Sequence, residues 1–275
     1  MRLVTAPRSA ALAPFVCSLS YHQGTLPPGR ERVLPNGTIT LMVNLGQDEF
    51  RTYSGPVASE VRRSGGAVLG GPEARAVMID TEEQAHGMAV SFRLGGAAPF
   101  VPLPLGETRD RLVDLAGLWG RDGAVLRERL LAAPTPRDGL AILESVLLSR
   151  LAAAQADAAV RDPAIARAAA ALERGRLVRD VCDDLGLLPK RFTRRFRDRT
   201  GLAPKLFARI RRVQRVVASV DPLNPARPVD WAAVAADHGY CDQAHLIDDF
   251  RDIAGITPGA YRPRSAGERN HVPLP

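Results

Sequence analysis

The feature that most constrains this chain of 275 residues is a repeat in its C-terminal half. The segment Phe196–Pro204 (FRDRTGLAP) recurs 54 positions later as Phe250–Pro258 (FRDIAGITP). Upstream, Val181–Gly186 parallels Val234–Gly239 at an offset of 53, so the second copy carries one extra residue in its turn. Self-similarity at such a period indicates that one supersecondary unit occurs twice.

Each copy is predicted to form a helix, a short turn and a second helix. In the first copy, Val178, Val181 and Leu185 have helical spacing, and Gly186 provides the left-handed residue that ends a helix. Pro189 then suits a first helical position, where the missing N–H costs nothing. In the second copy the corresponding residues are Trp231, Val234, Ala235, the stop Gly239 and the N-cap Asp242.

A single amphipathic helix is predicted between the two copies, from Pro204 to Val220. About 17 residues span ~25 Å, enough to hold two reading helices apart in a fixed relation. Such a spacer suits successive major grooves, which lie ~34 Å apart on one face of DNA. Its apolar residues are Phe207, Ile210, Val213, Val217 and Val220, and its arginines, Arg209, Arg211, Arg212 and Arg215, are expected to be exposed.

The second helix of the first copy, from Lys190 to Arg199, has the pattern of a DNA-reading helix. Phe192 and Phe196 at i and i+4 anchor one face to the core. The opposite face is predicted to read bases, since arginine binds guanine in two places and a threonine hydroxyl or methyl suits a base edge. A solvated basic helix is the simpler interpretation of such a run, but the duplication favours DNA reading. The predicted base-reading residues are Lys190, Thr193, Arg194 and Arg197, and Arg191 and Arg195 are predicted to contact phosphates.

The matching helix of the second copy carries different chemistry. Leu246 and Phe250 take the anchoring positions, and His245 and Asp249 lie on the flank of the outward face. Carboxylates approach phosphates poorly, although Asp can accept a hydrogen bond from cytosine N4. The first copy is therefore expected to supply most of the base reading and affinity, and the second either to read one or two bases or mainly to position the domain. The outward face comprises Ala244, Ile247, Asp248 and Arg251, with Arg251 predicted at a phosphate.

Residues 165–262 resemble the DNA-binding domain of the AraC/XylS family of transcription regulators over its full length. The similarity rests on AVAADHGYCDQAHL (233–246), followed by Phe250, Gly255, Pro258 and Tyr261 at fixed spacing. The resemblance implies a sequence-specific regulator of transcription that binds double-stranded DNA, and activation through RNA polymerase. Repression is equally compatible with the residues. It places Gln243, Ala244, Ile247 and Asp248 at base-reading positions of the second copy. Two departures are Leu188, where the family has a small polar cap, and Asp248, where a basic residue is common.

The N-terminal half is predicted to be a small β-barrel or sandwich followed by helices. Strands are expected at Thr38–Leu45, Ala76–Ile79 and Gly87–Phe92, between turns rich in Gly and Pro. The segments Leu34–Gly37, Asn44–Gly46 and Gly55-Pro56 are similar to the N-terminal regions of some AraC-type regulators. This half is expected either to bind a small-molecule effector or to serve homodimerisation and packing. The expected helices are Asp110–Leu118, Gly123–Ala132 and Pro136–Leu151.

The fold class is therefore α+β with two domains: a β-rich sensor domain with a helical tail at 1–155 and a DNA-binding domain at 156–265. A disordered tail is expected at 266–275. Charge agrees with this division, because the first 155 residues hold 16 Lys and Arg against 15 Asp and Glu, whereas the remainder holds 21 against 15. A basic half joined to a nearly neutral half indicates a polyanionic partner.

The sequence offers no catalytic or metal-binding motif, and no cofactor is expected. The three cysteines, Cys17, Cys182 and Cys241, are expected to be buried thiols rather than oxidation sensors. The alternative function is a DNA-tethered enzyme with a catalytic N-terminal domain, for which the lone Cys17 lacks neighbouring ligands. We expect no enzyme activity, no membrane segment and a cytoplasmic, nucleoid-associated protein.

Overall fold

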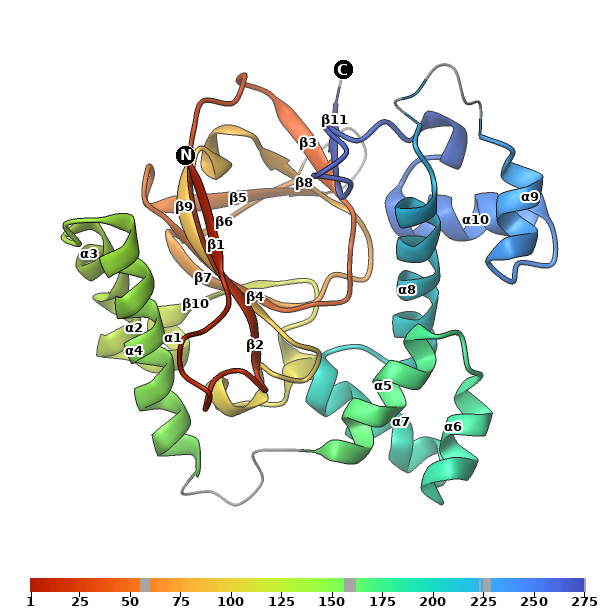
Figure 1. Cartoon of the computed structure of the whole chain (residues 1–275), viewed down its shortest axis with the longest axis horizontal. Helices are drawn as coiled ribbons and strands as arrows, with labels where there is room; N and C mark the ends of the chain where they lie inside the picture. The colour runs from red at the N-terminus through yellow and green to blue at the C-terminus, as the bar shows by residue number, and fades with distance from the viewer. Residues whose placement is uncertain (55–59, 156–161, 223, 225–228, 275) are drawn as a thin grey trace.

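The computed structural model describes residues 1–54, 60–155, 162–222, 224 and 229–274. Two β-sheets form the N-terminal part, four helices cover one side of it, and the C-terminal helices lie on the other side (Figure 1). The predicted fold class is confirmed. The predicted boundary between 155 and 156 abuts residues 156–161, which lie outside the described residues, as does Gly55-Pro56.

The larger sheet is antiparallel and has the strand order β1-β2-β9-β4-β7-β10. Two predicted strands, Thr38–Leu45 and Gly87–Phe92, are confirmed as β4 and β9 at its centre, paired in register from Thr40 with Ser91 to Asn44 with Gly87. The strands are β1 (Arg2–Thr5), β2 (Val16–Gln23), β4 (Thr40–Asn44), β7 (Ala67–Gly70), β9 (His86–Phe92) and β10 (Leu112–Asp114).

Helices pack on one face of this sheet and bury the core of the N-terminal domain. Alternate residues such as Leu19, Leu41 and Val90 point to that face and are almost completely buried, because successive side chains of a strand alternate between faces. They contact a stripe of leucines on α4, including Leu143 and Leu147. The helices are α1 (Leu115–Trp119), α2 (Arg121–Ala124), α3 (Leu126–Leu131) and α4 (Pro136–Gln155).

One predicted helix is wrong in its first half. The helix expected at Asp110–Leu118 begins only at Leu115, because Leu112–Asp114 forms the edge strand β10 against Val68–Gly70 of β7. The pairing of these three residues with β7 favours an extended conformation more than the spacing of the leucines favours a helix. The helix expected at Gly123–Ala132 is divided into α2 and α3 at Val125, and the helix expected at Pro136–Leu151 is confirmed as α4.

The smaller sheet has the strand order β11-β3-β8-β5-β6 and is also antiparallel. Its predicted strand, Ala76–Ile79, is confirmed as β8, whereas its other strands escaped sequence analysis. Polar residues within these strands, such as Glu31, Arg51 and Arg62, concealed their periodicity. The strands are β3 (Arg30–Val33), β5 (Glu49–Ser54), β6 (Glu60–Gly65), β8 (Val77–Asp80) and β11 (His271–Pro273).

The expectation of a disordered tail at 266–275 is wrong for the described residues. The chain returns from the C-terminal domain to the N-terminal domain, and His271–Pro273 pairs with Glu31–Val33 of β3 (Figure 1). The carboxylate of Glu31, which is fully buried, accepts hydrogen bonds from Arg264 at 2.8 Å and from His271. Pairing a buried charge offsets the high cost of removing it from water, and this explains why so polar a tail is ordered.

The described residues of the C-terminal domain form helices and connecting loops, and they have their own apolar core. Phe192, Phe196, Phe207, Phe250 and Tyr261 lie at its centre and are 0 to 1% exposed. The predicted pattern of two helical units joined by a long helix is confirmed. The helices are α5 (Pro163–Glu173), α6 (Val178–Leu185), α7 (Pro189–Thr200), α8 (Pro204–Ser219), α9 (Trp231–Asp237) and α10 (Gln243–Ala254).

The long helix α8 contacts the N-terminal domain at the segment Leu34–Gly37. Arg211 donates a hydrogen bond to the carbonyl of Asn36 at 2.9 Å, and Gln214 donates one to the carbonyl of Pro35 at 2.8 Å. Gly37 has φ +77° and lies against the ring of Phe207, so this position suits a residue without a side chain. The segment that sequence analysis singled out therefore forms part of the contact between the domains.

Candidate DNA interface

Helices α6 and α7 form the first unit, and local residues set their ends. Gly186 adopts the left-handed conformation at the end of α6, and α7 begins at Pro189 as predicted. Leu188 occupies the N-cap of α7 without a capping side-chain hydrogen bond, and it is 76% exposed. The departure from a polar cap therefore leaves an apolar side chain on the surface beside the predicted reading face.

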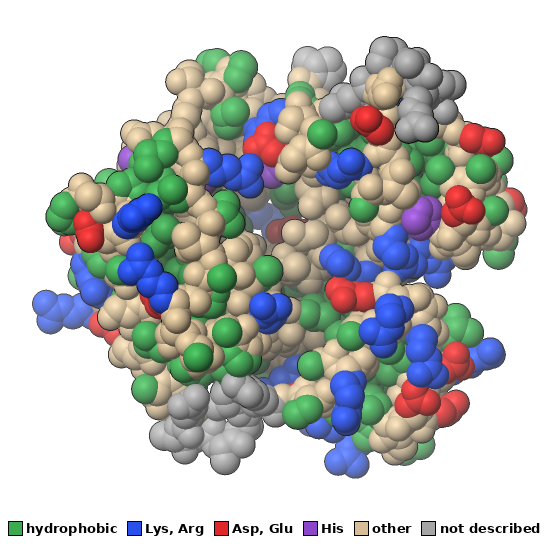
Figure 2. Space-filling model, viewed as in Figure 1, with side chains coloured by type: hydrophobic (Ala, Val, Ile, Leu, Met, Phe, Trp, Pro, Cys, Tyr) green, Lys and Arg blue, Asp and Glu red, His purple; other side chains and the backbone are tan. Residues whose placement is uncertain are grey.

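The reading face of α7 is presented to solvent, with its opposite face firmly anchored. Phe192 and Phe196 are fully buried, with ring centroids 5.5 Å apart, and Phe196 lies 5.6 Å from Phe207 of α8. All the side chains predicted to read bases from this helix are exposed. Lys and Arg side chains gather over this part of the molecule (Figure 2). Exposed cations on a rigidly anchored helix are what a major-groove contact requires.

Arg195 differs from the other arginines of α7 because it is already paired. Its guanidinium donates two hydrogen bonds, of 2.6 and 2.9 Å, to the carboxylate of Asp162, which also caps α5 through the amide of Ile165. Partial burial opposes ionisation of Asp162, but the hydrogen bonds from Arg195 and Ile165 hold its pKa below the usual value. Arg195 therefore joins α7 to α5, and contact with a phosphate would compete with this pair.

Arg197 lies where the reading helix meets the N-terminal domain. The aliphatic part of the Arg197 side chain packs against Gly106 in the short helix η4 (Leu105–Glu107). A Cβ on Gly106 would lie only 3.0 Å from Arg197 Cγ. The Arg197 side chain is still 52% exposed. Of the four predicted base-reading residues of α7, Arg197 is the one for which the structure records contact with the N-terminal domain.

Helices α9 and α10 form the second unit, and the predicted N-cap of α10 is confirmed. The carboxylate of Asp242 accepts a hydrogen bond from the amide of His245 at 2.7 Å. Leu246 and Phe250 are fully buried, as the repeat predicts. Among the proposed contact residues, Gln243, Ala244, Asp248 and Arg251 are exposed, whereas Ile247 is half-buried. Arg251 lies 3.5 Å from the carboxylate of Asp248.

The predicted position of Asp249, on the flank of the outward face, is wrong. Asp249 is 4% exposed and forms a 2.6 Å ion pair with Arg209 of α8. Arg209 also reaches Asp252 at 2.8 Å. Only one carboxylate, that of Asp248, therefore remains on the predicted reading face of α10.

The expectation that the arginines of α8 are exposed is also wrong, because all four are half-buried. Arg211 forms an ion pair of 3.1 Å with Glu173 of α5, and Arg215 donates to the carbonyl of the same residue. Arg212 lies over the ring of Tyr240 in the second unit, 5.0 Å from its centroid. These side chains connect α8 to α5 and to the second unit. Glu173 lies 38 residues from Arg211 and 42 from Arg215, and Tyr240 lies 28 residues from Arg212, so helical periodicity along α8 could not identify these partners.

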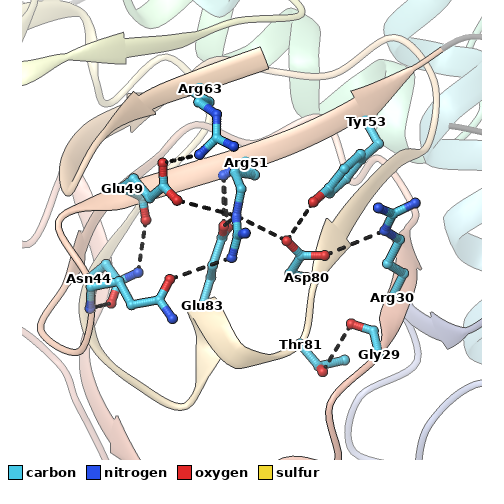
Figure 3. Close-up of polar contacts among 11 residues, drawn as sticks. Gly29, Arg30, Asn44, Glu49, Arg51, Tyr53, Arg63, Asp80, Thr81 and Glu83 are labelled. Carbon is cyan, nitrogen blue, oxygen red and sulfur yellow. Dashed lines mark hydrogen bonds and ion pairs between the residues drawn. The ribbon is translucent and has the colours of Figure 1, made fainter. Parts of the chain in front are cut away.

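The smaller sheet of the N-terminal domain carries a cluster of charged residues centred on Arg51 (Figure 3). Arg51 forms ion pairs with Glu83 at 2.8 Å and Asp80 at 3.1 Å, and Tyr53 donates a hydrogen bond of 2.6 Å to Asp80. The hydrogen bond from Arg51 to Glu83 raises the pKa of the guanidinium. Because these charges satisfy one another, the cluster stabilises the sheet rather than offering free groups to a ligand.

The cysteines are not all buried, contrary to expectation. Cys182 is buried in α6, and burial raises the pKa of its thiol. Cys17 and Cys241 are exposed, Cys17 at an irregularity in the pairing of β2 with β9. Within the described ranges, no group of three or more His, Cys, Asp and Glu side chains is arranged to hold a metal ion. The helices of the same ranges include none with the length and apolar character of a membrane span.

Two anchored reading helices, each following a short turn and both joined through α8, define a duplicated helix-turn-helix protein. Residues 181–264 match the family model described as "Helix-turn-helix domain", as the repeat predicted, and the C-terminal region is an AraC-type domain, as the resemblance implied. Residues 5–114 match the model described as "Domain of unknown function (DUF6597)". The chain is a DNA-binding transcription regulator.

Among solved structures, the chain is similar to ToxT from Vibrio cholerae. An apo ToxT variant has 10% sequence identity and a TM-score of 0.43, with 94% of this chain and 96% of that chain covered. ToxT bound to an unsaturated fatty acid has 10% identity and a TM-score of 0.41, with 94% and 93% covered. No curated protein matches the sequence of this chain.

Proposed function

We propose that this regulator reads a specific duplex site with both helix-turn-helix units, placed in two successive major grooves. Helix α7 contributes most of the affinity, through Lys190, Thr193 and Arg194 at bases and Arg191 at a phosphate. Helix α10 reads fewer bases, through Gln243, Ala244 and Ile247, and Arg251 contacts a phosphate. Arg197 of α7 and Asp248 of α10 are also proposed to contact bases, and Arg195 of α7 to contact a phosphate.

One observation carries this proposal: each reading helix is anchored by a fully buried apolar pair and braced to the same helix, α8. Phe192 and Phe196 anchor α7, and Leu246 and Phe250 anchor α10. Arg209 fixes α10 to α8 by two ion pairs. A fixed relation between reading helices favours a fixed spacing between the two half-sites that they recognise.

We further propose that the N-terminal domain controls DNA binding, through a ligand held between its two sheets or through self-association. Residues of the larger sheet that face away from the helices, such as His22, Thr40 and Met42, are only half-buried. His22 Nε2 is buried and has no hydrogen-bond partner among the described residues. The surface is hollowed near the centre of the view in Figure 2, on the N-terminal domain. Activation through RNA polymerase is the proposed output.

The test is a titration of the full chain against the DNA upstream of its own gene and against scrambled DNA of equal length, from low to physiological salt. Counterion release weakens both complexes as salt rises, so the ratio of the two affinities is the informative quantity. We expect a ratio of about 1,000 or more at physiological salt. A ratio near one, together with no preferred site in a random-sequence selection, would exclude sequence-specific binding.

A further inference from the structure

A groove runs between the reading helix α7 and the N-terminal domain. It has a volume of about 900 Å³ and is open to solvent along its length. One wall is the flank of α7 that carries Lys190, Arg191, Arg194 and Arg199. The other wall is the segment 98–104 of the N-terminal domain, which is rich in proline and apolar side chains.

The groove carries positive charge without compensation. Within the part of the chain that the structure describes, Lys190, Arg191 and Arg199 have no ion-pair partner within 4 Å, and Arg194 approaches Asp198 only to 3.9 Å. Arg195 also lines the groove but is neutralised by Asp162. Among the described residues that line the groove, Asp198 is the one with a carboxylate. Such a concentration of cations against one acid attracts anions and favours an anionic occupant.

The position of the groove favours a DNA strand as that occupant. Lys190 and Arg194 line the groove and also belong to the proposed reading face, so a duplex read by α7 brings one of its backbones along this flank. Phosphates meet the cations of α7, and the apolar wall at Pro102 and Leu103 suits the less polar edge of the deoxyribose rings. An open groove also fits a continuous polymer better than a closed pocket would.

We propose that the segment 98–104 of the N-terminal domain forms the second wall of the DNA-binding groove, so that the N-terminal domain contacts the DNA backbone directly. The inference rests on the proposed function for the placement of α7 in a major groove. It adds that affinity depends on residues outside the helix-turn-helix domain. Any movement of the N-terminal domain relative to α7 would then change the affinity for DNA.

The experiment reverses the charge at one exposed residue of this wall. Pro102 is exposed and lies in the groove, so Pro102→Lys and Pro102→Glu place opposite charges on flexible side chains beside the proposed strand. Pro134 provides a matched control, because it is an exposed proline of the same domain, between α3 and α4. In Figure 1 those helices lie on the side of the sheets away from α7. Comparing Lys with Glu at each position cancels the effect of losing the proline.

Binding of the full-length variants to a duplex is measured between 50 and 200 mM salt. We expect Pro102→Lys to bind about tenfold more tightly than Pro102→Glu at the low-salt end. The Lys variant should also show a slope of log K against log salt that is steeper by about 0.9, the value for one added phosphate contact. Specific and scrambled duplexes should change together, because backbone contacts carry no sequence information.

Equal affinities and slopes for Pro102→Lys and Pro102→Glu would overturn the proposal. A Lys-to-Glu difference at Pro134 as large as the difference at Pro102 would also overturn it, because only the net charge of the protein would then matter. The proposed function fails separately, when the unmodified chain shows no preference for any duplex sequence. In that case the comparison at Pro102 still reports whether the groove follows a DNA backbone.

Discussion

On the reading helix, neighbouring arginines serve different purposes because of what surrounds each guanidinium. Arg194 is 82% exposed and has only a distant carboxylate, whereas Arg195 is held by Asp162 in two short hydrogen bonds. An exposed, unpaired arginine loses little on binding a base or phosphate, but a paired one must first lose its partner. We therefore expect the largest effect on DNA recognition from Arg194.

Arg194→Ala is expected to weaken specific binding by about 1–3 kcal/mol and to relax the selectivity at one base pair, because a bidentate contact to guanine is lost. Affinities for the selected site and for its single-base variants measure both effects. Arg174→Ala, which removes an exposed arginine outside the proposed face, serves as the control. An equal loss on every sequence would show that Arg194 contacts a phosphate instead.

Glu73 provides a pH-dependent contribution to stability. Burial, together with the nearby charge of Asp110, raises the pKa of Glu73 to about 8. The folded state therefore holds a proton that the unfolded state releases above about 4.5, and this contribution to the free energy of unfolding declines as pH rises from 4.5 through 8. Glu73→Gln should flatten this decline, as measured by urea unfolding at pH 5, 6.5 and 8. An unchanged pH dependence in the variant would contradict the assignment.

Among the elements, α8 determines how the two reading helices are related. It buries Phe207, Ile210 and Val213 in the core shared by both units, and its other face carries the arginines that reach α5 and α10. Asp249 makes this connection costly to break, because its carboxylate is buried. Its remaining contact is a 3.3 Å hydrogen bond from the hydroxyl of Tyr240.

Arg209→Met is expected to lower the free energy of unfolding by about 2 kcal/mol, because it leaves the charge of Asp249 buried without its cation. The double variant Arg209→Met/Asp249→Asn should recover part of this loss, since the buried charge is then absent. Arg251→Met breaks only the exposed pair with Asp248 and should cost less than 1 kcal/mol. Chemical denaturation measures all three. Equal losses of unfolding free energy for Arg209→Met and Arg251→Met would contradict a stabilising role for the ion pair of Arg209 with buried Asp249.

At the scale of the whole molecule, the C-terminal segment joins the two domains. Arg269 donates hydrogen bonds to the carbonyls of Val217 and Val220 at the end of α8, at 2.9 and 2.6 Å. A few residues later, β11 completes the smaller sheet through β3. A further connection comes from Arg75, whose hydrogen bond to Asp252 of α10 holds the pKa of that carboxyl below its usual value, with Arg209 adding to the effect.

Truncation after Pro263 should destabilise both domains together. It removes the cation and imidazole that pair with buried Glu31, the partner strand of β3 and the hydrogen bonds of Arg269 to α8. We expect faster amide hydrogen exchange in β3 and in the last turn of α8, with little change in α7. Gly267→Ala is the control, because a Cβ at that exposed position meets no atom within 4 Å. Unchanged protection of β3 in the truncated chain would show that the strand is stable without β11.

The sequence alone determined the features that depend on short spacing. The repeat, the anchoring pairs, Gly186, Pro189 and Asp242 identified the helices of both units, because helical periodicity and capping act within a few residues. The strands β4, β8 and β9 followed from apolar runs between turns. The class of the C-terminal domain was predicted from the same local signals.

Only the tertiary structure decided which distant residues meet. Glu31 and His271 are separated by 240 positions, and Arg209 and Asp249 by 40. No local preference encodes such pairs, because the free energy of a buried charge depends on the partner that folding brings to it. The groove between α7 and the segment 98–104 arises for the same reason: its two walls belong to different domains. Their separation depends on how the domains pack at α8, at β11 and where Arg197 of α7 lies against Gly106, rather than on either sequence segment alone.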